Sequence, residues 1–433
     1  MPYSRPSKKG EKKVPRKTVD LIIENASELA TPQGDRQRPL VGKQMQALRV
    51  IKNAAIAVKD GKIVAVGKTA TVKSMFKATE TIDAKEKTLV PGFVDPHTHL
   101  VFAGSREREF EMRVKGASYM EIHREGGGIL KTVRETRQAT EDELARNCKR
   151  ELDAMLEHGT TTVEAKSGYG LTIKDEVKCL RIIQQVNKAH AVDLVPTFLG
   201  AHAIPLEYEG NTEDYVNLVI EGMIPSVAGA GLAEFCDVFC EEGVFTIEQS
   251  RRILHAGIKH GLTPKLHADE LTPFGGAELA ADIRAVSAEH LLYASEAGLK
   301  MMSERGVVAV LLPAASFTLM TQKCADARNM IELGVPVALG TDFNPSCWVE
   351  SQQLVIAIAC RQLRLTPAEA LTASTLNAAH AINRAAETGS LEKGKKADVL
   401  ILDTPNHTFL GYRFGTNLVS KVVKEGKLVV DLE

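Results

Sequence analysis

The chain has 433 residues, of which 44% are hydrophobic and 25% are charged. This balance is typical of a folded globular protein and excludes an extended disordered chain, and the length fits one large domain plus a smaller one. The 54 Lys and Arg residues are offset by 55 Asp and Glu residues, which gives a formal net charge of −1. A chain so balanced has no general attraction to nucleic acid or anionic lipid, so we expect neither as a partner.

The N-terminal segment 1–17 carries seven basic residues and one acidic residue and lacks the apolar core of a secretory signal. We interpret it as a disordered tail. The alternative is a nucleic-acid-binding arm, which the net charge and the lack of interleaved aromatic residues make weaker. The longest uncharged run, 306–322, is too short and too polar to cross a bilayer. Seven scattered cysteines indicate reduced thiols in a cytoplasmic protein.

Both ends of the remaining chain predict β-strands. Residues 19–29 and 54–67 alternate apolar and polar side chains, with a tight turn at Asp60-Gly61. Residues 389–403 and 421–431 repeat the pattern around Glu425-Gly426. Neither end alone supplies enough strands for a stable sheet with a buried face. We therefore predict that residues 18–88 and 385–433 pair to form one small composite β-sandwich domain.

Residues 89–384 alternate short apolar runs with longer helical patterns, which predicts βα units and a parallel sheet. One expected helix has Thr140 as its N-cap and ends at Gly159. The 246 residues from His97 to Asp342 match the roughly 250 of a closed (β/α)8 barrel. We expect the eighth strand among residues 110–135. Seven strands are clear, at residues 89–97, 160–168, 192–202, 263–270, 285–290, 306–313 and 335–344.

Polar residues follow five of these runs at the C-terminal end of each strand. In a barrel these ends surround one mouth, where active sites are built, whereas an open sheet would spread them along a line. A barrel is therefore favoured. The residues are His97 and His99, His202, His267 with Glu270, His290, and Asp342 with Asn344.

The pair His97 and His99 lies two residues apart, so both imidazoles point to the same side of an extended strand. With His267 and Asp342 they can hold one divalent metal per chain and leave a position for water. The metal lowers the pKa of that water and supplies a hydroxide nucleophile. These donors suit Zn²⁺ and Fe²⁺/Fe³⁺ comparably. A metal-bridging carbamate on Lys166 is a weaker alternative, because one metal is satisfied without it.

With VPGFVDPHTHL, HADE and TDFNP, the chain resembles the amidohydrolase superfamily. Members are metal-dependent hydrolases built on a βα barrel, with a small β-sandwich formed by both chain ends. The resemblance extends to one family within it, the imidazolonepropionase family, and covers nearly all of the chain except the basic tail. The motifs occur in that family's order and spacing: HTHLVFAGSRE, GGGILKTVRETR, EAKSGYGL, GAHAIP, HADE, AEHL and TDFNP.

This resemblance implies hydrolysis of the cyclic amide of 4-imidazolone-5-propanoate to N-formimidoyl-L-glutamate, the third step of histidine degradation, in a homodimer. The residues leave open whether Glu270, His290 or Asp342 shuttles the proton; we favour Glu270 assisted by His290, with Asp342 mainly a metal ligand. The matching positions are His97, His99, His267 and Asp342 for the metal, and Arg106, Tyr169, His202, Glu270, His290 and Asn344 for the substrate or product.

One loop departs from the family pattern. After Asn344 and Pro345 the family often has glycine and then serine, where this chain has Ser346 and Cys347. Both positions are expected to contact the substrate, and a thiol makes a weaker hydrogen bond than a hydroxyl.

Two other interpretations assign a different function to the same fold. A purine or triazine aminohydrolase would keep the metal residues but would not need Arg106, which can grip a carboxylate with two hydrogen bonds. A non-catalytic scaffold would be expected to have lost metal ligands, and all four are present in the sequence.

Overall fold

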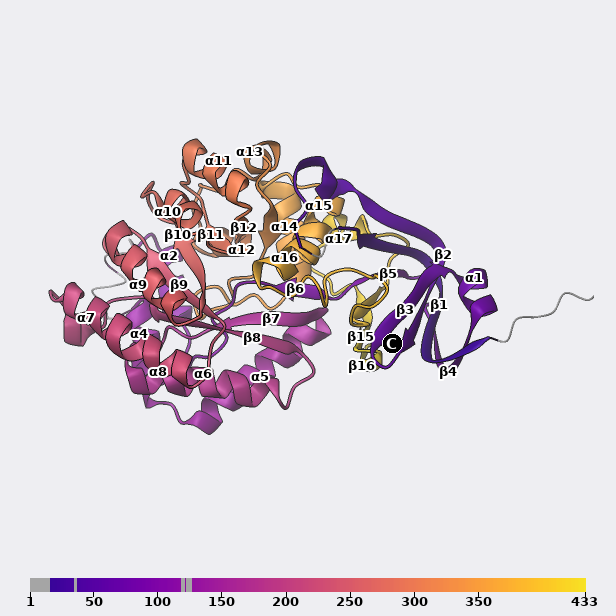
Figure 1. Ribbon diagram of the computed structural model, residues 1–433, viewed down its shortest axis with the longest axis horizontal. Helices are drawn as coiled ribbons and strands as arrows, with labels where there is room; N and C mark the ends of the chain where they lie inside the picture. Colours follow the sequence, from indigo (N-terminus) through magenta and orange to yellow (C-terminus); the bar gives the residue numbers. More distant parts are fainter. Residues whose placement is uncertain (1–15, 35–36, 118–120, 122–126) are drawn as a thin grey trace, which may run out of the picture.

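The computed structural model describes residues 16–34, 37–117, 121 and 127–433. The strands form two eight-stranded sheets, one built from the middle of the chain and one from both ends (Figure 1). The predicted fold class, a (β/α)8 barrel with a composite β-domain, is confirmed. Most of the predicted tail lies outside the described residues, and its last residue, Lys17, already belongs to the first strand.

The barrel sheet contains eight strands in chain order, and each strand pairs in parallel with the next. Nearly all of their residues are buried, as expected for parallel strands that are covered by helices. The strands are β6 (Phe93–Asp95), β7 (Thr160–Lys166), β8 (Asp193–Ala201), β9 (Phe235–Cys240), β10 (Thr263–Ala268), β11 (Ser287–His290), β12 (Val308–Leu311) and β13 (Val337–Leu339).

The first and last strands meet just beyond their C-terminal ends. Thr98 and Phe343 form a parallel bridge. The amide of His99 donates to the carbonyl of Phe343 at 2.8 Å, and the amide of Asp342 donates to the carbonyl of His97 at 3.1 Å. Barrel closure therefore places two of the predicted metal ligands beside a third that lies more than half of the chain away.

The eighth strand is not where the sequence analysis expected it. It is β9, whereas the described part of residues 110–135 contributes to the helices α2 (Glu107–Val114) and α4 (Ile129–Gln138). The prediction was wrong because β9 carries Asp237 at its centre. A charged residue inside a buried strand breaks the apolar run by which such strands are recognised.

Helices follow the barrel strands and cover the outside of the sheet (Figure 1). The N-cap at Thr140 is confirmed, since its hydroxyl accepts from the amide of Glu143, and Gly159 follows the helix with a φ of +95°. These helices are α5 (Glu141–Glu157), α6 (Ile173–Asn187), α7 (Thr212–Leu218), α8 (Ile224–Gly229), α9 (Ile247–Lys259), α10 (Gly276–Asp282), α11 (Glu296–Arg305), α12 (Pro313–Thr318), α13 (Ala327–Glu332), α14 (Gln352–Gln362), α15 (Pro367–Ala373) and α16 (Leu376–Ala381).

The second sheet joins the two ends of the chain in the order β16-β15-β14-β5-β1-β2-β3, with β4 paired to β1. The hairpins at Asp60-Gly61 and Glu425-Gly426 are confirmed. The helices α1 (Thr69–Met75) and α17 (Phe409–Tyr412) accompany this sheet in the chain. Its strands are β1 (Lys17–Pro32), β2 (Leu48–Lys59), β3 (Lys62–Lys68), β4 (Phe76–Asp83), β5 (Thr88–Pro91), β14 (Val399–Leu402), β15 (Val419–Lys424) and β16 (Lys427–Asp431).

The longest strand pairing between the two ends is that of β5 with β14, which is antiparallel and places Leu89 opposite Ile401. Figure 1 shows the N-terminal strands and the C-terminal strands side by side, next to the barrel. The domain boundaries at residues 88/89 and 384/385 stay a prediction. Among the described residues, no helix has the length and apolar character needed to span a membrane.

Candidate active site

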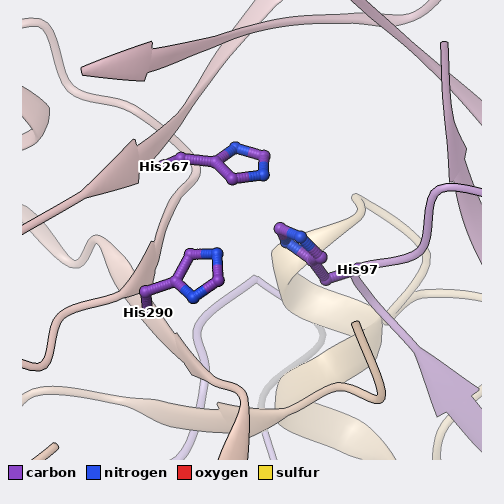
Figure 2. Close-up of side chains that lie close together, drawn as sticks. All are labelled: His97, His267 and His290. Atoms are coloured by element: carbon purple, nitrogen blue, oxygen red, sulfur yellow. The ribbon is translucent and has the colours of Figure 1, made fainter. Parts of the chain in front are cut away.

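Three imidazoles meet at the C-terminal mouth of the barrel. Figure 2 shows His97, just after β6, turned toward His267 of β10 and His290 at the end of β11. The ring centre of His97 lies 4.6 Å from that of His267 and 5.5 Å from that of His290. Strands that lie far apart in the sequence thus bring together the side chains that were predicted to share one site.

Asp342 completes this cluster. Its Oδ1 lies 3.3 Å from Nε2 of His97 and 3.5 Å from Nε2 of His99. Candidate ligand atoms of His97, His99 and Asp342 lie within 4.8 Å of one another, and so do those of His97, His267 and His290. Nε2 of His267 is buried without a hydrogen-bond partner among the described residues. A buried nitrogen left in this way is unfavourable unless something else binds it. The donor set fits a divalent metal.

The charge states of Asp342 and His99 suit a cation. Burial alone would raise the pKa of Asp342, but hydrogen bonds from His97 and His99 hold it well below its usual range. Burial lowers the pKa of His99 to about 4, so its imidazole is neutral at pH 7. An ionised carboxylate and a neutral imidazole are the forms that bind metals.

Two carboxylates behind the histidines were missed by the sequence analysis. Glu289 is ion-paired with Nδ1 of His97, and Asp237 Oδ2 lies 3.0 Å from Nδ1 of His267. Both carboxylates are fully buried. A signal was present, because each is a lone acidic residue within a short apolar strand and buried charges are normally paired.

Lys166 is not available for a carbamate. Its Nζ lies 2.8 Å from both Glu164 and Asp237 and 2.9 Å from Glu289. Burial alone would lower the pKa of Lys166, but these three carboxylates hold it well above its usual range. Carbamate formation requires a neutral amine that faces a metal, so these three ion pairs argue against this alternative.

The metal-ligand cluster opens into a cavity of about 170 Å³. This volume is well above the roughly 30 Å³ that one water occupies in the liquid and suits a small molecule. His97 does not line the cavity but contacts Asp342, which does. Eleven of the twelve predicted site residues line the cavity: His99, Arg106, Tyr169, His202, His267, Glu270, His290, Asp342, Asn344, Ser346 and Cys347. The sequence analysis missed Glu109, Arg113 and Phe239 in the same lining.

Arg106 precedes α2 and is 9% exposed. Its Nε donates to the hydroxyl of Thr132 at 3.0 Å, which fixes one edge of the guanidinium. Its Nη2 is buried and has no hydrogen-bond partner among the described residues. Tyr169 lies beside the guanidinium, and burial raises the pKa of its hydroxyl above the usual value, so the hydroxyl remains a donor. The pair can bind an anionic group.

His202 at the end of β8 faces the same cavity. Its Nδ1 lies 3.0 Å from the carbonyl oxygen of Gly168. Because a carbonyl only accepts, Nδ1 carries the hydrogen and Nε2 is left as an acceptor. The ring stacks on His99 with a centre-to-centre distance of 4.8 Å. Burial lowers the pKa of His202 well below its usual value, so the ring is neutral, and these contacts hold it in one orientation.

Glu270 and His290 lie next to each other at the barrel mouth. Oε2 of Glu270 lies 3.6 Å from Nε2 of His290. Burial, together with Asp342 and Glu241, raises the pKa of Glu270 to about 8. Burial lowers the pKa of His290 well below its usual value. Glu241 also fixes the loop, since its Oε2 accepts from the amides of Glu270 and Leu271 at 3.0 and 2.9 Å.

The loop after β13 is held by the side chain of Asn344. Its Oδ1 accepts from the amides of Ser346 at 2.8 Å and Cys347 at 3.1 Å. Its Nδ2 donates to the carbonyl of Asp342 at 2.8 Å. The sulfur of Cys347 lies 3.5 Å from the carbonyl of Thr341. These contacts give Asn344 and Cys347 structural roles, and substrate contact by them stays a prediction.

Two strand-terminal site residues have left-handed backbones. The φ angles are +72° for His290 and +52° for Asp342. Such a conformation in a non-glycine residue is unfavourable by about 1–3 kcal/mol and is retained where the surrounding structure enforces it. In both cases the turn directs the side chain to the barrel mouth.

The closed barrel, the composite β-domain and the His and Asp cluster define a metal-dependent hydrolase of the amidohydrolase class. Residues 246–429 match the model of the amidohydrolase family. An adenosine deaminase from Xanthomonas campestris with bound zinc has a similar fold, with a TM-score of 0.72 and 21% identity over 96% of this chain and 94% of that one.

Curated relatives identify the family more closely. Imidazolonepropionase of Geobacillus sp. strain WCH70 is 53% identical over 415 residues, covering 95% of this chain and 98% of the relative. Imidazolonepropionase of Shouchella clausii is 53% identical over 416 residues, covering 95% and 93%. The chain belongs to the imidazolonepropionase family and is a hydrolase.

Proposed function

We propose that the chain hydrolyses the cyclic amide of 4-imidazolone-5-propanoate to N-formimidoyl-L-glutamate, the third step of histidine degradation. The observation that supports this most directly is Arg106, a buried guanidinium whose Nη2 has no hydrogen-bond partner in the described part of the chain, in the same cavity as the His and Asp cluster. A propanoate carboxylate is the group that such a donor binds best. The names of the curated relatives support the same substrate.

His97, His99, His267 and Asp342 would hold one divalent metal per chain, Zn²⁺ or iron. When bound, such a metal lowers the pKa of a water ligand and makes it nucleophilic near neutral pH. The neutral imidazole of His99 and the ionised Asp342 match the protonation states that this role requires.

Arg106 and Tyr169 would orient the substrate by its carboxylate. The Nε contact to Thr132 holds the guanidinium plane, so that its free edge faces the cavity. His202 would accept a hydrogen bond from a ring N–H through Nε2. Asn344, Ser346 and Cys347 would border the ring side, mainly through their backbone. Holding the ring in one pose makes the attack of water on it effectively unimolecular.

The reaction adds the oxygen of water to the ring carbonyl carbon and breaks the bond from that carbon to the ring nitrogen. One proton leaves the water and one reaches the departing nitrogen. We assign this transfer to Glu270, whose raised pKa lets it hold a proton near neutrality, with His290 assisting at 3.6 Å. Asp342 stays ionised, so it suits metal binding better than proton transfer.

We also propose a cytoplasmic location and a homodimer. All seven cysteines are free thiols, five of them buried, which suits a reducing compartment. Light scattering on the purified chain measures the oligomeric state, and a mass of one chain would contradict the dimer.

The deciding experiment is a turnover assay with freshly prepared 4-imidazolone-5-propanoate, read as N-formimidoyl-L-glutamate formed, with metal analysis of the same sample. We expect activity with about one metal per chain, and loss of both metal and activity in His267→Ala. Metal-loaded protein that ignores this substrate but deaminates an aminopurine would contradict the proposed substrate. Metal-free, inactive protein that resists reconstitution would contradict catalysis altogether.

A further inference from the structure

Beneath the histidines lies a closed cluster of charged side chains that the proposed reaction does not use. All of them are fully buried, and none lines the cavity. Burying charges is unfavourable unless each one is well paired, so such a cluster calls for a reason beyond stability. Its members come from β7, β9, β10 and β11 and are Glu164, Lys166, Asp237, Lys265 and Glu289.

Lys166 contacts the two oxygen atoms of this cluster that face imidazoles. Its Nζ lies 2.8 Å from Oδ2 of Asp237 and 2.9 Å from Oε2 of Glu289. The same Oδ2 lies 3.0 Å from Nδ1 of His267, and the same Oε2 is ion-paired with Nδ1 of His97. One ammonium group therefore fixes both oxygens against which the two rings are oriented.

We propose that Lys166 is a positioning residue for the metal site. Through Asp237 and Glu289 it holds His267 and His97 with Nδ1 toward the cluster and Nε2 toward the metal position. Carboxylates that accept from the far nitrogen of a ligating imidazole fix its tautomer and ring orientation. The proposal rests on the proposed function, since it presupposes the metal ligands assigned there.

Lys265 offers a matched control. It is as deeply buried as Lys166 and carries the same charge. It contacts Glu289 through the other oxygen, Oε1, at 3.0 Å, Glu164 at 3.2 Å and the carbonyl of Pro96 at 3.1 Å. Among the described residues it has no ion pair with Asp237. Lys265 thus supports the cluster without touching the oxygens that face the two histidines.

A pure charge effect and a positioning effect of Lys166 predict opposite changes in metal affinity. Two ammonium groups face three carboxylates, so the cluster is negative by one charge. Removing either lysine increases this excess, which by Coulomb attraction alone would tighten cation binding. Loss of ring orientation would instead weaken it, and only at Lys166.

The test compares Lys166→Met with Lys265→Met in the full chain. Each protein is stripped of metal and titrated with Zn²⁺ in competition with a chromophoric chelator. We expect Lys166→Met to bind Zn²⁺ about 10–100-fold more weakly than the unmodified chain, as is usual when outer-shell support is lost. Lys265→Met should bind as tightly or more tightly. With Co²⁺, the visible absorption spectrum should change in Lys166→Met and remain as in the unmodified chain in Lys265→Met.

Isosteric variants keep the test decisive if a lysine variant fails to fold. Asp237→Asn and Glu289→Gln should each weaken Zn²⁺ binding, and Lys166→Met combined with Asp237→Asn should lose less than the sum of the two single losses. Three outcomes would overturn the positioning role alone. They are equal losses of Zn²⁺ affinity in both lysine variants, full additivity of the losses in the double variant, and unchanged Zn²⁺ binding in both isosteric variants. An unmodified chain that binds no metal would overturn the proposed function itself.

Discussion

Arg106 has a fixed Nε and an Nη2 that meets no hydrogen-bond partner within the described ranges, and this predicts which kinetic constant its replacement changes. In Arg106→Ala the substrate carboxylate loses a charge-assisted hydrogen-bonding partner, a loss of about 1.5–3 kcal/mol. We expect KM to rise roughly 10–100-fold, with Arg106→Lys intermediate because it keeps the charge without the fork. Steady-state kinetics measure this, with the exposed Arg108→Ala as control. A loss confined to kcat would contradict the role.

A substitution of Glu270 tests proton transfer separately from metal binding. Its carboxylate contacts His290 and is not among the proposed metal ligands. We expect Glu270→Gln to lower kcat by about 10²–10⁴, the usual range for a general acid–base group. Metal content should stay at that of the unmodified chain. Metal analysis beside the turnover assay checks this, and a variant that loses its metal would show that Glu270 acts on the metal site instead.

At the residue scale the sequence predicted which side chains meet at the barrel mouth, but it did not predict the carboxylates that support them. His97, His267, Glu270 and Asp342 follow apolar runs at strand ends, where barrel geometry brings them together. Asp237 and Glu289 instead lie within strands, and nothing in their spacing says which imidazole each one faces. That pairing depends on strand order around the closed barrel, which becomes known only with the fold.

The loop between β7 and α6 depends on one buried carboxylate. Glu176 accepts from the amides of Gly170 and Leu171, both at 2.8 Å, and from the amide of Gly168 at 3.1 Å. Glu176→Ala would leave these amides unsatisfied, at about 1–3 kcal/mol each where they stay buried. We expect the free energy of unfolding to fall by about 3 kcal/mol or more, and KM to rise because Tyr169 lies in this loop.

Chemical denaturation and substrate kinetics measure the two effects of Glu176→Ala. The exposed Lys174→Ala, two residues earlier on the same helix, is the control and should change neither. If stability fell while KM stayed constant, Tyr169 would not depend on this loop for its place.

At the element scale, the sequence predicted seven of the eight barrel strands and both hairpins of the small domain. Alternation and turn residues identify hairpins locally, so Asp60-Gly61 could be placed without the fold. β9 could not, because Asp237 lowers its apolar character and is accommodated only by the facing Lys166 and His267. The strand forms because Asp237 is paired with residues far away in the sequence. A short stretch of sequence around β9 does not contain those partners.

Across the whole molecule, Glu28 links the two ends of the chain. Its Oε1 accepts from the amide of His407 at 3.0 Å, and its Oε2 is 2.6 Å from Nζ of Lys52. Burial alone would raise the pKa of Glu28, but contacts with His407 and Lys52 lower it to about 2. A lowered carboxyl pKa stabilises the folded state above the ordinary pKa near 4.5, and this stabilisation is lost as the pH falls toward 2.

We therefore expect Glu28→Gln to reduce the free energy of unfolding by about 1–2 kcal/mol at pH 7, because the mostly exposed Lys52 is screened by solvent. The difference should shrink as the pH falls from about 4.5 to about 2, where the native carboxyl also becomes protonated. Denaturation curves at a series of pH values measure it. Asp60→Asn, at an exposed carboxylate in the first hairpin, should change stability by less than about 1 kcal/mol. A pH-independent loss in Glu28→Gln would contradict the electrostatic origin.

The pairing of β5 with β14 has a consequence for how the protein is made. Ribosomes synthesise the chain from the N-terminus onward at about 5–20 residues per second. Some 300 residues separate the two strands. The open edge of β5 therefore waits roughly 15–60 s for its partner at those rates. An unpaired edge is a template for association with other chains. Nascent chains of this protein should be most prone to aggregate during that interval, and a trigger-factor-like holdase that covers β5 should raise the soluble yield.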